Sequence, residues 1–324
     1  MTAVSYHDTV NDLQGLNWSG GGPFARLEWF ALLETTAASP LIVLAQDGDQ
    51  ALTMPLQFGD GQLEPLTNWY AFSWRALSTE ERIPHEMITA IGKALAKRTN
   101  RIVLDKVPEE EVTARALSQG FFAAGWHVIR EQSDVNHVLS LNGRTYEEYL
   151  SGRPGPLRTT LKRKAKKVEV VLATTFSEED WAAYEAVYAD SWKPEEGDPA
   201  LLRNFAELES AAGRYRFALA KLEGKPVAAQ FWTVENGTAY IHKLAHRQSA
   251  QNVSPGTTLT AALMQHVIDL DHVKMVDFGT GDDPYKRDWM EDIRTRYRLT
   301  CVRPGDPRNW LIMGKALIRK LVRR

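Results

Sequence analysis

Residues 215–289 constrain the fold of this chain most strongly, because they place three strand patterns, a helix start and a further strand in close succession. The stretch 215–221 alternates apolar and polar residues, and 227–234 is rich in β-branched and aromatic residues. An Asn-Gly pair at 236–237, a strong short hairpin signal, leads into 238–246. We therefore expect three antiparallel strands joined by tight turns.

A helix is expected over 255–270, directly after these strands. Ser254 has the N-cap position, Pro255 has the first helical position, and Gly256 adds no side chain. The hydroxyl of an N-cap serine accepts a hydrogen bond from a backbone N–H group of its own helix. The remaining N–H groups and the positive end of the helix dipole attract a phosphate. Gly256 would let such a phosphate come close. The next strand is expected at 274–280.

Two motifs flank this helix. Gln251 to Gly256 reads Gln-Asn-Val-Ser-Pro-Gly, and Asp277 to Lys286 reads Asp-Phe-Gly-Thr-Gly-Asp-Asp-Pro-Tyr-Lys. With these motifs and its order of elements, the segment 168–304 resembles a GNAT acyltransferase. Its loops resemble the branch named for an acetyltransferase associated with cellulose biosynthesis, which is related to the Fem-type aminoacyltransferases. The family's pyrophosphate loop reads Gln/Arg-x-x-Gly-x-Gly/Ala, so the chain matches it at Gln251 and Gly256.

At Ser254 the chain departs from that loop pattern. The resemblance implies an α+β fold with a mixed, mostly antiparallel sheet flanked by helices, and acyl-CoA, such as acetyl-CoA, as the co-substrate. It also implies that the strands 238–246 and 274–280 splay apart, so that free backbone N–H groups face the thioester. The implied CoA-binding residues are Leu244, Ala245, His246, Gln251, Ser254, Gly256, Thr257 and Thr258.

The implied proton carriers, Asp282, Asp283 and Tyr285, follow the strand 274–280. Two adjacent carboxylates raise one another's pKa, which suits a base. Each candidate also has a structural interpretation: Asp283 could cap a short turn, and Tyr285 could only pack its ring. Lys286 is expected to hold an acidic group, either Asp282 or a substrate carboxylate.

His242 is a further candidate base, on a strand face that we expect it to share with Tyr240 and Leu244. A histidine on such a face is more often a core residue. Six of the histidines show no HxxxH or Cys/His ligand spacing among themselves, so no metal site is expected; they are His85, His127, His137, His246, His266 and His272.

The first half of the chain repeats the second in outline. The elements expected there are a strand, turn and strand at 40–58, a helix at 84–98, a strand at 101–107, a helix at 108–119 and a closing strand at 126–141. We therefore expect tandem GNAT folds, with a degenerate domain over 1–140 and an acyl-CoA-binding domain over 141–324. The alternative is a single mixed α/β domain with an unrelated N-terminal cap.

Four aromatic residues are candidates for an acceptor cleft between the halves, because flat aromatic faces pack well on sugar rings or acyl chains. The alternative for each of them is a place in the core. They are Trp69, Tyr70, Trp74 and Trp232.

The net charge of −2 hides an asymmetry. Residues 1–135 hold 10 Lys/Arg and 17 Asp/Glu, whereas 136–324 hold 29 and 24, so a phosphate-bearing partner is expected at the second half. The basic run 153–167 could meet CoA phosphates, an acidic substrate or RNA, although a solvated helix face is favoured. No signal peptide or long apolar run is present, so a cytoplasmic protein without stable membrane insertion is expected.

Three functions remain open. The first is an acyl-CoA-dependent N- or O-acyltransferase acting on a small molecule or saccharide. The second is a Fem-like transferase that takes its acyl group from charged tRNA, with 153–167 as the RNA contact. The third is a catalytically silent tandem GNAT protein that binds a ligand.

Overall fold

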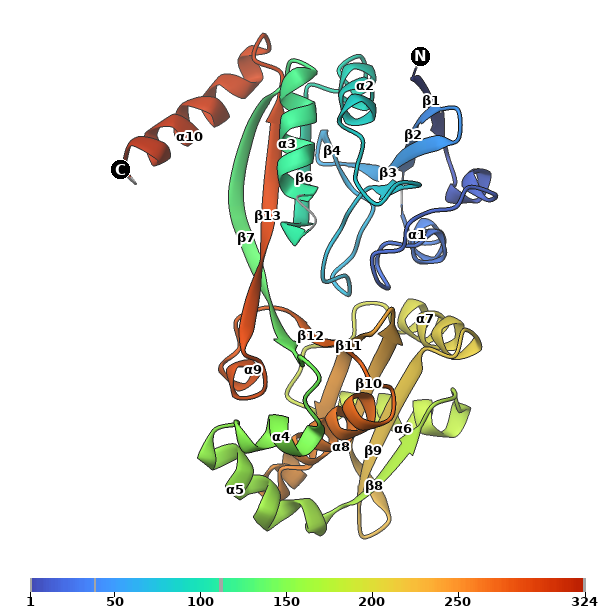
Figure 1. Cartoon of the computed structure of the whole chain (residues 1–324), viewed down its shortest axis with the longest axis vertical. Helices are drawn as coiled ribbons and strands as arrows, with labels where there is room; N and C mark the ends of the chain where they lie inside the picture. The colour runs from blue at the N-terminus through green and yellow to red at the C-terminus, as the bar shows by residue number, and fades with distance from the viewer. Residues whose placement is uncertain (1, 38, 111–112, 323–324) are drawn as a thin grey trace. The chain divides into compact units, whose positions relative to one another are not determined.

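The computed structural model describes residues 2–37, 39–110 and 113–322 (Figure 1). These residues form two compact units. The first contains the residues up to Val135 and those from Arg294 onward, and the second runs from Asn136 to Ile293. The second unit is therefore one continuous segment, placed within the sequence of the first.

The first unit combines a sheet with helices. Its sheet has the strand order β1-β2-β3-β4-β6-β13-β7, with β5 beside β3. The strands are β1 (Ala3–His7), β2 (Pro40–Asp47), β3 (Gln50–Gly59), β4 (Gln62–Pro65), β5 (Leu77–Ser78), β6 (Arg101–Pro108), and parts of β7 (His127–Ser140) and β13 (Asp292–Val302). The helical segments are η1 (Val10–Leu13), α1 (Leu27–Glu34), α2 (His85–Leu95), α3 (Thr113–Ala123), η5 (Pro307–Asn309) and α10 (Trp310–Val322).

Helices α2 and α3 pack directly on each other. Gly120 of α3 faces Ile88 of α2 so closely that a Cβ on Gly120 would collide with it, and Gly92 of α2 faces Ala124 in the same way. The helix expected at 108–119 begins at Thr113 among the described residues and continues to Ala123, while residues 111 and 112 lie outside them.

The second unit has the strand order β7-β12-β11-β10-β9-β8. All neighbouring strands are antiparallel except β11 and β12, which are parallel. Its strands are β8 (Glu169–Ala173), β9 (Tyr215–Leu222), β10 (Lys225–Glu235), β11 (Thr238–His246) and β12 (Met275–Thr280). Its helical segments are α4 (Tyr146–Ser151), α5 (Gly155–Lys164), η3 (Ala165–Lys167), α6 (Glu178–Ala189), α7 (Pro199–Ala211), η4 (Gln248–Val253), α8 (Pro255–Asp269) and α9 (Pro284–Trp289).

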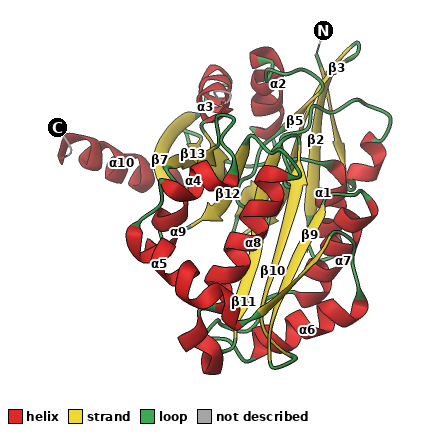
Figure 2. Ribbon diagram, turned by 60° about the horizontal axis from the view of Figure 1, so that its bottom comes forward, coloured by secondary structure: helices red, strands yellow, loops and turns green. Residues whose placement is uncertain are grey.

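Helices cover both faces of this sheet. On one face, Phe231 of β10 packs its ring against Trp181 of α6 and Phe205 of α7. On the other face, α8 lies across β9, β10 and β11, and Leu263 shares a buried cluster with Trp232 (Figure 2). The mixed, mostly antiparallel sheet flanked by helices is thus confirmed.

Strands β7 and β13 divide their pairing between the units. From Arg296 to Val302, β13 pairs with β6 of the first unit, whereas the end of β7, from Asn136 to Ser140, pairs with β12 of the second. The expected division at 140/141, with everything up to residue 324 in the second domain, differs from this arrangement. The reason is that β7 begins in the first unit and ends in the second, whereas β13 begins in the second unit and continues into the first.

None of the helices in the described part of the chain is long and apolar enough to cross a membrane.

Candidate functional site

Strands β11 and β12 part after a short common stretch. Their parallel pairing ends at Tyr240 and Asp277 among the described residues. Beyond that point β11 continues to His246 and β12 to Thr280. The expected splay between these strands is confirmed, and the end of β11 is open on the side where β12 would have continued.

A β-bulge sets the directions of the side chains on β11. The register with β10 shifts after Phe231, which leaves His242 without a residue directly opposite. The His242 ring lies 5.1 Å from the rings of Phe205 and Phe231, and its Nε2 lies 2.8 Å from Thr233 Oγ1. Leu244 instead faces α8. The expectation that His242 and Leu244 share a face is wrong, because a bulge breaks the alternation of a strand.

Ser254 does not cap α8 with its side chain. It adopts a left-handed backbone conformation with φ of 52°, and no cap hydrogen bond forms from its hydroxyl. Instead, Lys164 Nζ donates a hydrogen bond to Ser254 Oγ over 3.0 Å. The expectation that the serine occupies the helix's own N–H groups is therefore wrong, and the last residue of α5 brings an ammonium group to the start of α8.

The first turn of α8 has two free backbone donors. Pro255 has no N–H, and the N–H of Thr258 donates to the Ser254 carbonyl over 3.2 Å. No group in the described part of the chain accepts a hydrogen bond from the N–H of Gly256 or Thr257. Two such donors at the positive end of a helix form a ready anion site.

Gln230 fixes this turn from within the core. Its Nε2 donates to the Gly256 carbonyl over 3.0 Å and to Thr260 Oγ1 over 2.7 Å, while its Oε1 accepts from Trp232 Nε1 over 2.8 Å. Trp232 is fully buried in the cluster beneath α8. The expectation that Trp232 lines an acceptor cleft is wrong, because it faces α8 and its N–H is engaged by Gln230.

A pocket of about 480 Å³ opens beside the start of α8. A Cβ on Gly256 would lie 3.3 Å from Leu244 Cδ1 and 3.5 Å from His246 Cδ2, so the bare glycine backbone forms part of its wall. Its lining residues come from α5, the loop after α6, and the elements around the strand gap. They are Leu157, Trp192, Lys193, Leu244, His246, Gln251, Ser254, Pro255, Gly256, Thr257, Thr260, Asp283, Tyr285, Asp288 and Trp289.

Asp283 and Tyr285 face this pocket together. Asp283 occupies the N-cap position of α9, but its side chain makes no capping hydrogen bond, so the structural interpretation of Asp283 as a cap is wrong. The surrounding protein desolvates the Tyr285 hydroxyl, and this desolvation, followed by the negative charge of Asp283, raises its pKa to about 12. Tyr285 therefore keeps its proton at neutral pH, as a proton donor must.

Asp282 and Lys286 are engaged elsewhere. Hydrogen bonds from Arg287 and then His137 hold the pKa of Asp282 below its usual value, so the expectation that its neighbour raises this pKa is wrong. Lys286 is buried, and its Nζ donates to the carbonyl oxygens of Gly279, over 3.3 Å, and Thr280. It does not pair with Asp282, which is held by Arg287 over 2.5 Å.

Two of the expected CoA-binding residues do not line the pocket. Ala245 is fully buried opposite Ala229 in the strand ladder. Thr258 is also buried, and its hydroxyl donates to the Ser254 carbonyl over 3.3 Å.

Three aromatic candidates belong to the first unit. Trp74 is buried in the core of that unit, where its Nε1 donates to the Pro55 carbonyl over 3.0 Å, so the acceptor-cleft expectation is wrong for this residue. Trp69 is half exposed, and its ring centroid lies 4.9 Å from that of Tyr70. A role for Trp69 and Tyr70 in acceptor binding stays a prediction.

Sequence reasoning missed Trp192 and Lys193, which lie in the loop after α6. The Trp192 ring packs 4.3 Å from the His246 ring. Burial, and then the positive charge of Lys243, lower the pKa of the Lys193 ammonium to about 8. The only signal was the composition of the run 192–196, Trp-Lys-Pro-Glu-Glu, which is dense in aromatic and charged residues for a helix connection.

No three His, Cys, Asp or Glu side chains within the described ranges are grouped so that they could hold a metal ion.

Residues 156–287 match a protein family described as an acetyltransferase (GNAT) domain. None of the curated proteins compared matches the chain in sequence.

Several solved structures are similar to the chain over most of its length. FemX matches with a TM-score of 0.64 at 11% identity, covering 95% of this chain and 99% of FemX. L-PGS from Bacillus licheniformis matches with a TM-score of 0.57 at 13% identity, covering 94% and 99%. A tandem GNAT protein from the clavulanic acid biosynthesis pathway matches with a TM-score of 0.54 at 13% identity, covering 94% and 100%. At these identities the likenesses bear on the fold alone.

Proposed function

We propose that this chain is an acyl-CoA-dependent acyltransferase, because residues 156–287 match a GNAT acetyltransferase domain. The acceptor is an amine or hydroxyl of a small molecule or saccharide. The donor binds in the pocket at the start of α8, beside the gap between β11 and β12.

One observation carries this proposal: free anion-binding donors and proton-transfer groups line the same pocket. The unpaired N–H groups of Gly256 and Thr257, with Lys164 beside them at Ser254, fit the diphosphate of CoA. Asp283 and Tyr285 lie in the same pocket wall. A donor held by its diphosphate would place its reactive end among groups that can move protons.

When bound, acyl-CoA supplies an acyl group activated as a thioester. Asp283 takes the proton that the acceptor nitrogen or oxygen loses as it forms its bond to the acyl carbon. Tyr285 gives its phenolic proton to the sulfur as the carbon–sulfur bond breaks, and the proton on Asp283 then returns to Tyr285 through water. Backbone N–H groups at the open end of β11 stabilise the negative charge that develops on the carbonyl oxygen.

Calorimetric titration with acetyl-CoA tests the donor site. Gly256→Val should weaken binding sharply, because its branched side chain would enter the cradle beside Leu244 and His246. Gly155→Val is the matched control, since Gly155 also stands in the first turn of a helix but a Cβ added to it would meet no atom within 4 Å. Equal affinity of wild type and Gly256→Val for acetyl-CoA would mean that the diphosphate does not bind at Gly256.

A Fem-like transferase that takes its acyl group from charged tRNA is the second candidate. It is favoured by a run of exposed cations on α5 and the turn after it: Arg158, Lys162, Arg163, Lys166 and Lys167. A binding assay with charged tRNA, run beside the acetyl-CoA titration, separates the two. Binding of CoA without turnover on any amine or hydroxyl would instead support a silent ligand-binding protein.

A further inference from the structure

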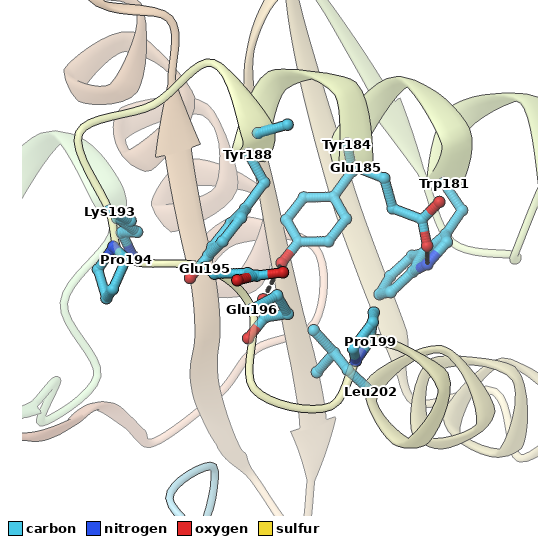
Figure 3. Close-up of a pocket in the computed structure, with 11 residues that line it drawn as sticks. Trp181, Tyr184, Glu185, Tyr188, Lys193, Pro194, Glu195, Glu196, Pro199 and Leu202 are labelled. Carbon is cyan, nitrogen blue, oxygen red and sulfur yellow. Dashed lines mark hydrogen bonds between the residues drawn. The ribbon is translucent and has the colours of Figure 1, made fainter.

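A second pocket, of about 590 Å³, lies between α6 and α7 in the second unit (Figure 3). It is on the sheet face opposite α8. Its lining residues are Trp181, Tyr184, Glu185, Tyr188, Ala189, Lys193, Pro194, Glu195, Glu196, Pro199 and Leu202. Lys193 lines both this pocket and the donor pocket, whereas the other lining residues of this pocket do not line the donor pocket.

Three buried aromatic residues form the inner wall of this pocket: Trp181, Tyr184 and Tyr188. The face of Tyr188 already receives positive charge, since Lys243 Nζ lies 5.3 Å and Lys193 Nζ 6.0 Å from the ring centroid. Aromatic faces attract ammonium groups in this distance range. Two ammonium groups of the protein already occupy the Tyr188 face, so the wall offers a ligand apolar contact and no further cation–π site at Tyr188.

Three carboxylates surround the aromatic wall (Figure 3). Glu196 accepts hydrogen bonds from Lys243 Nζ over 2.7 Å and from the Tyr184 hydroxyl over 3.0 Å, and Glu185 accepts from Trp181 Nε1 over 3.1 Å. Glu195 has no hydrogen-bond or ion-pair partner among the described residues. The pocket therefore offers negative charge that the protein has not neutralised.

Lys193 connects this pocket to the donor site. It lines both pockets, and its ammonium interacts electrostatically with Glu196 on one side and with Asp283 on the other. A molecule that fills the α6–α7 pocket and extends past Lys193 would reach Asp283. This continuity makes the α6–α7 pocket the approach of the acceptor to the donor.

We propose that the α6–α7 pocket, through Glu195 and the aromatic wall, holds a cationic group of the acceptor. The acceptor is then a basic amino compound with two amino groups: one stays in this pocket while the other extends past Lys193 and is acylated beside Asp283. This inference rests on the proposed acyltransferase function. A neutral saccharide could stack on the aromatic wall and donate hydrogen bonds to Glu195, but it would leave the negative charge of this carboxylate uncompensated.

In the transfer step, the second amino group reacts as the neutral amine, after its ammonium proton has gone to water; its nitrogen bonds to the acyl carbon and loses a proton to Asp283. The carbon–sulfur bond breaks, and the sulfur takes a proton from Tyr285. The products are an amide and free CoA thiol, while the first amino group is unchanged.

The test uses the full-length protein, α,ω-diaminoalkanes of two to eight carbons, the monoamines of equal length and glucosamine. Diamine binding is measured by calorimetry without acyl-CoA, and turnover is followed by release of free thiol. The variants are Glu195→Gln, which removes charge at nearly constant size, and Glu179→Gln, an exposed glutamate of α6 outside the pocket.

We expect diamines to bind more tightly than the matched monoamines and to have higher kcat/KM. Glu195→Gln should raise the KM for diamines about two- to fivefold, as expected for an exposed charge pair, with acetyl-CoA affinity and kcat little changed. Glu179→Gln should behave as wild type. Equal kcat/KM for diamines and monoamines, or preference for glucosamine, would overturn the inference while leaving an active acyltransferase. Diamine binding that responds to Glu195→Gln without any acyl transfer would support this site and overturn the proposed function.

Discussion

Removal of the Lys164 side chain should weaken CoA binding selectively. The ammonium group of Lys164 lies 3.0 Å from Ser254 Oγ, directly beside the two free N–H groups of α8. A phosphate bound to those groups would lie within one side-chain length of this charge. Lys164→Ala therefore removes an attractive charge from the anion site, while the backbone donors remain.

The size of the effect follows from the surroundings of Lys164, which is half-buried. Two unit charges about 4 Å apart attract by about 1 kcal/mol in water and about 4 kcal/mol near a protein surface. After the residual solvation of a half-buried lysine is allowed for, about 1 to 3 kcal/mol remains, which corresponds to roughly a 5- to 150-fold rise in Kd.

Calorimetric titration with CoA at low and at high salt is the assay, and Lys162→Ala is the matched control. Lys162 carries the same charge on the same helix but is exposed, and no hydrogen bond joins it to α8. The affinity of Lys164→Ala should be lower and less sensitive to salt than that of wild type, while Lys162→Ala should change little. An equal loss in both variants would mean that only the net charge of the helix matters, and unchanged affinity in Lys164→Ala would refute a diphosphate at this turn.

Three further predictions concern proton transfer, packing and charge. Tyr285→Phe should lower turnover by roughly 10²- to 10⁴-fold in steady-state assays, and a change in thermal midpoint alone would reduce Tyr285 to a packing residue. Gly120→Ala should destabilise the protein by about 1 to 3 kcal/mol in denaturant unfolding, because its Cβ would collide with Ile88. Gly314→Ala, in the open part of α10, should instead be neutral or stabilising by up to about 1 kcal/mol; similar losses at both positions would contradict the packing argument. Hydrogen bonds from Arg144, and then the charge of Arg153, hold the pKa of Glu291 below its usual value, so this carboxylate stabilises the fold above its unfolded pKa and loses that contribution as pH falls through the folded value. Glu291→Gln should therefore cost about 1 kcal/mol at pH 7 and progressively less below about pH 4, and a pH-independent difference between the two proteins would be contrary to this reasoning.

The parts of the fold that sequence reasoning predicted are those with local signals. The β-branched and aromatic residues of 227–234 and the Asn236-Gly237 turn after them identified β10 and β11, and Pro255 marked the first residue of α8. The gap after Tyr240, implied by the family resemblance, is also present. Each of these features depends on residues that are neighbours in sequence.

The features that were mispredicted depend on distant contacts. Lys164 and Ser254 are 90 positions apart, so no local pattern indicates that an ammonium group replaces the serine cap. The bulge after Phe231 places His242 and Leu244 on opposite faces of β11, and it depends on the pairing with β10. The pKa of Asp282 was expected to be raised, but hydrogen bonds from Arg287 and from His137, which is 145 positions away, lower it.

The position of β13 has a consequence for how the protein is made. In the first unit this strand lies between β6 and β7, yet it is supplied by residues after Arg294, which leave the ribosome only when all of the second unit has been synthesised. The nascent first unit must therefore wait, with one side of β6 unpaired, for roughly 160 further residues, or about 10 to 30 s at usual translation rates. During that interval an unsatisfied strand edge is open to chaperones or to misassembly, whereas the second unit needs no later residue to fold.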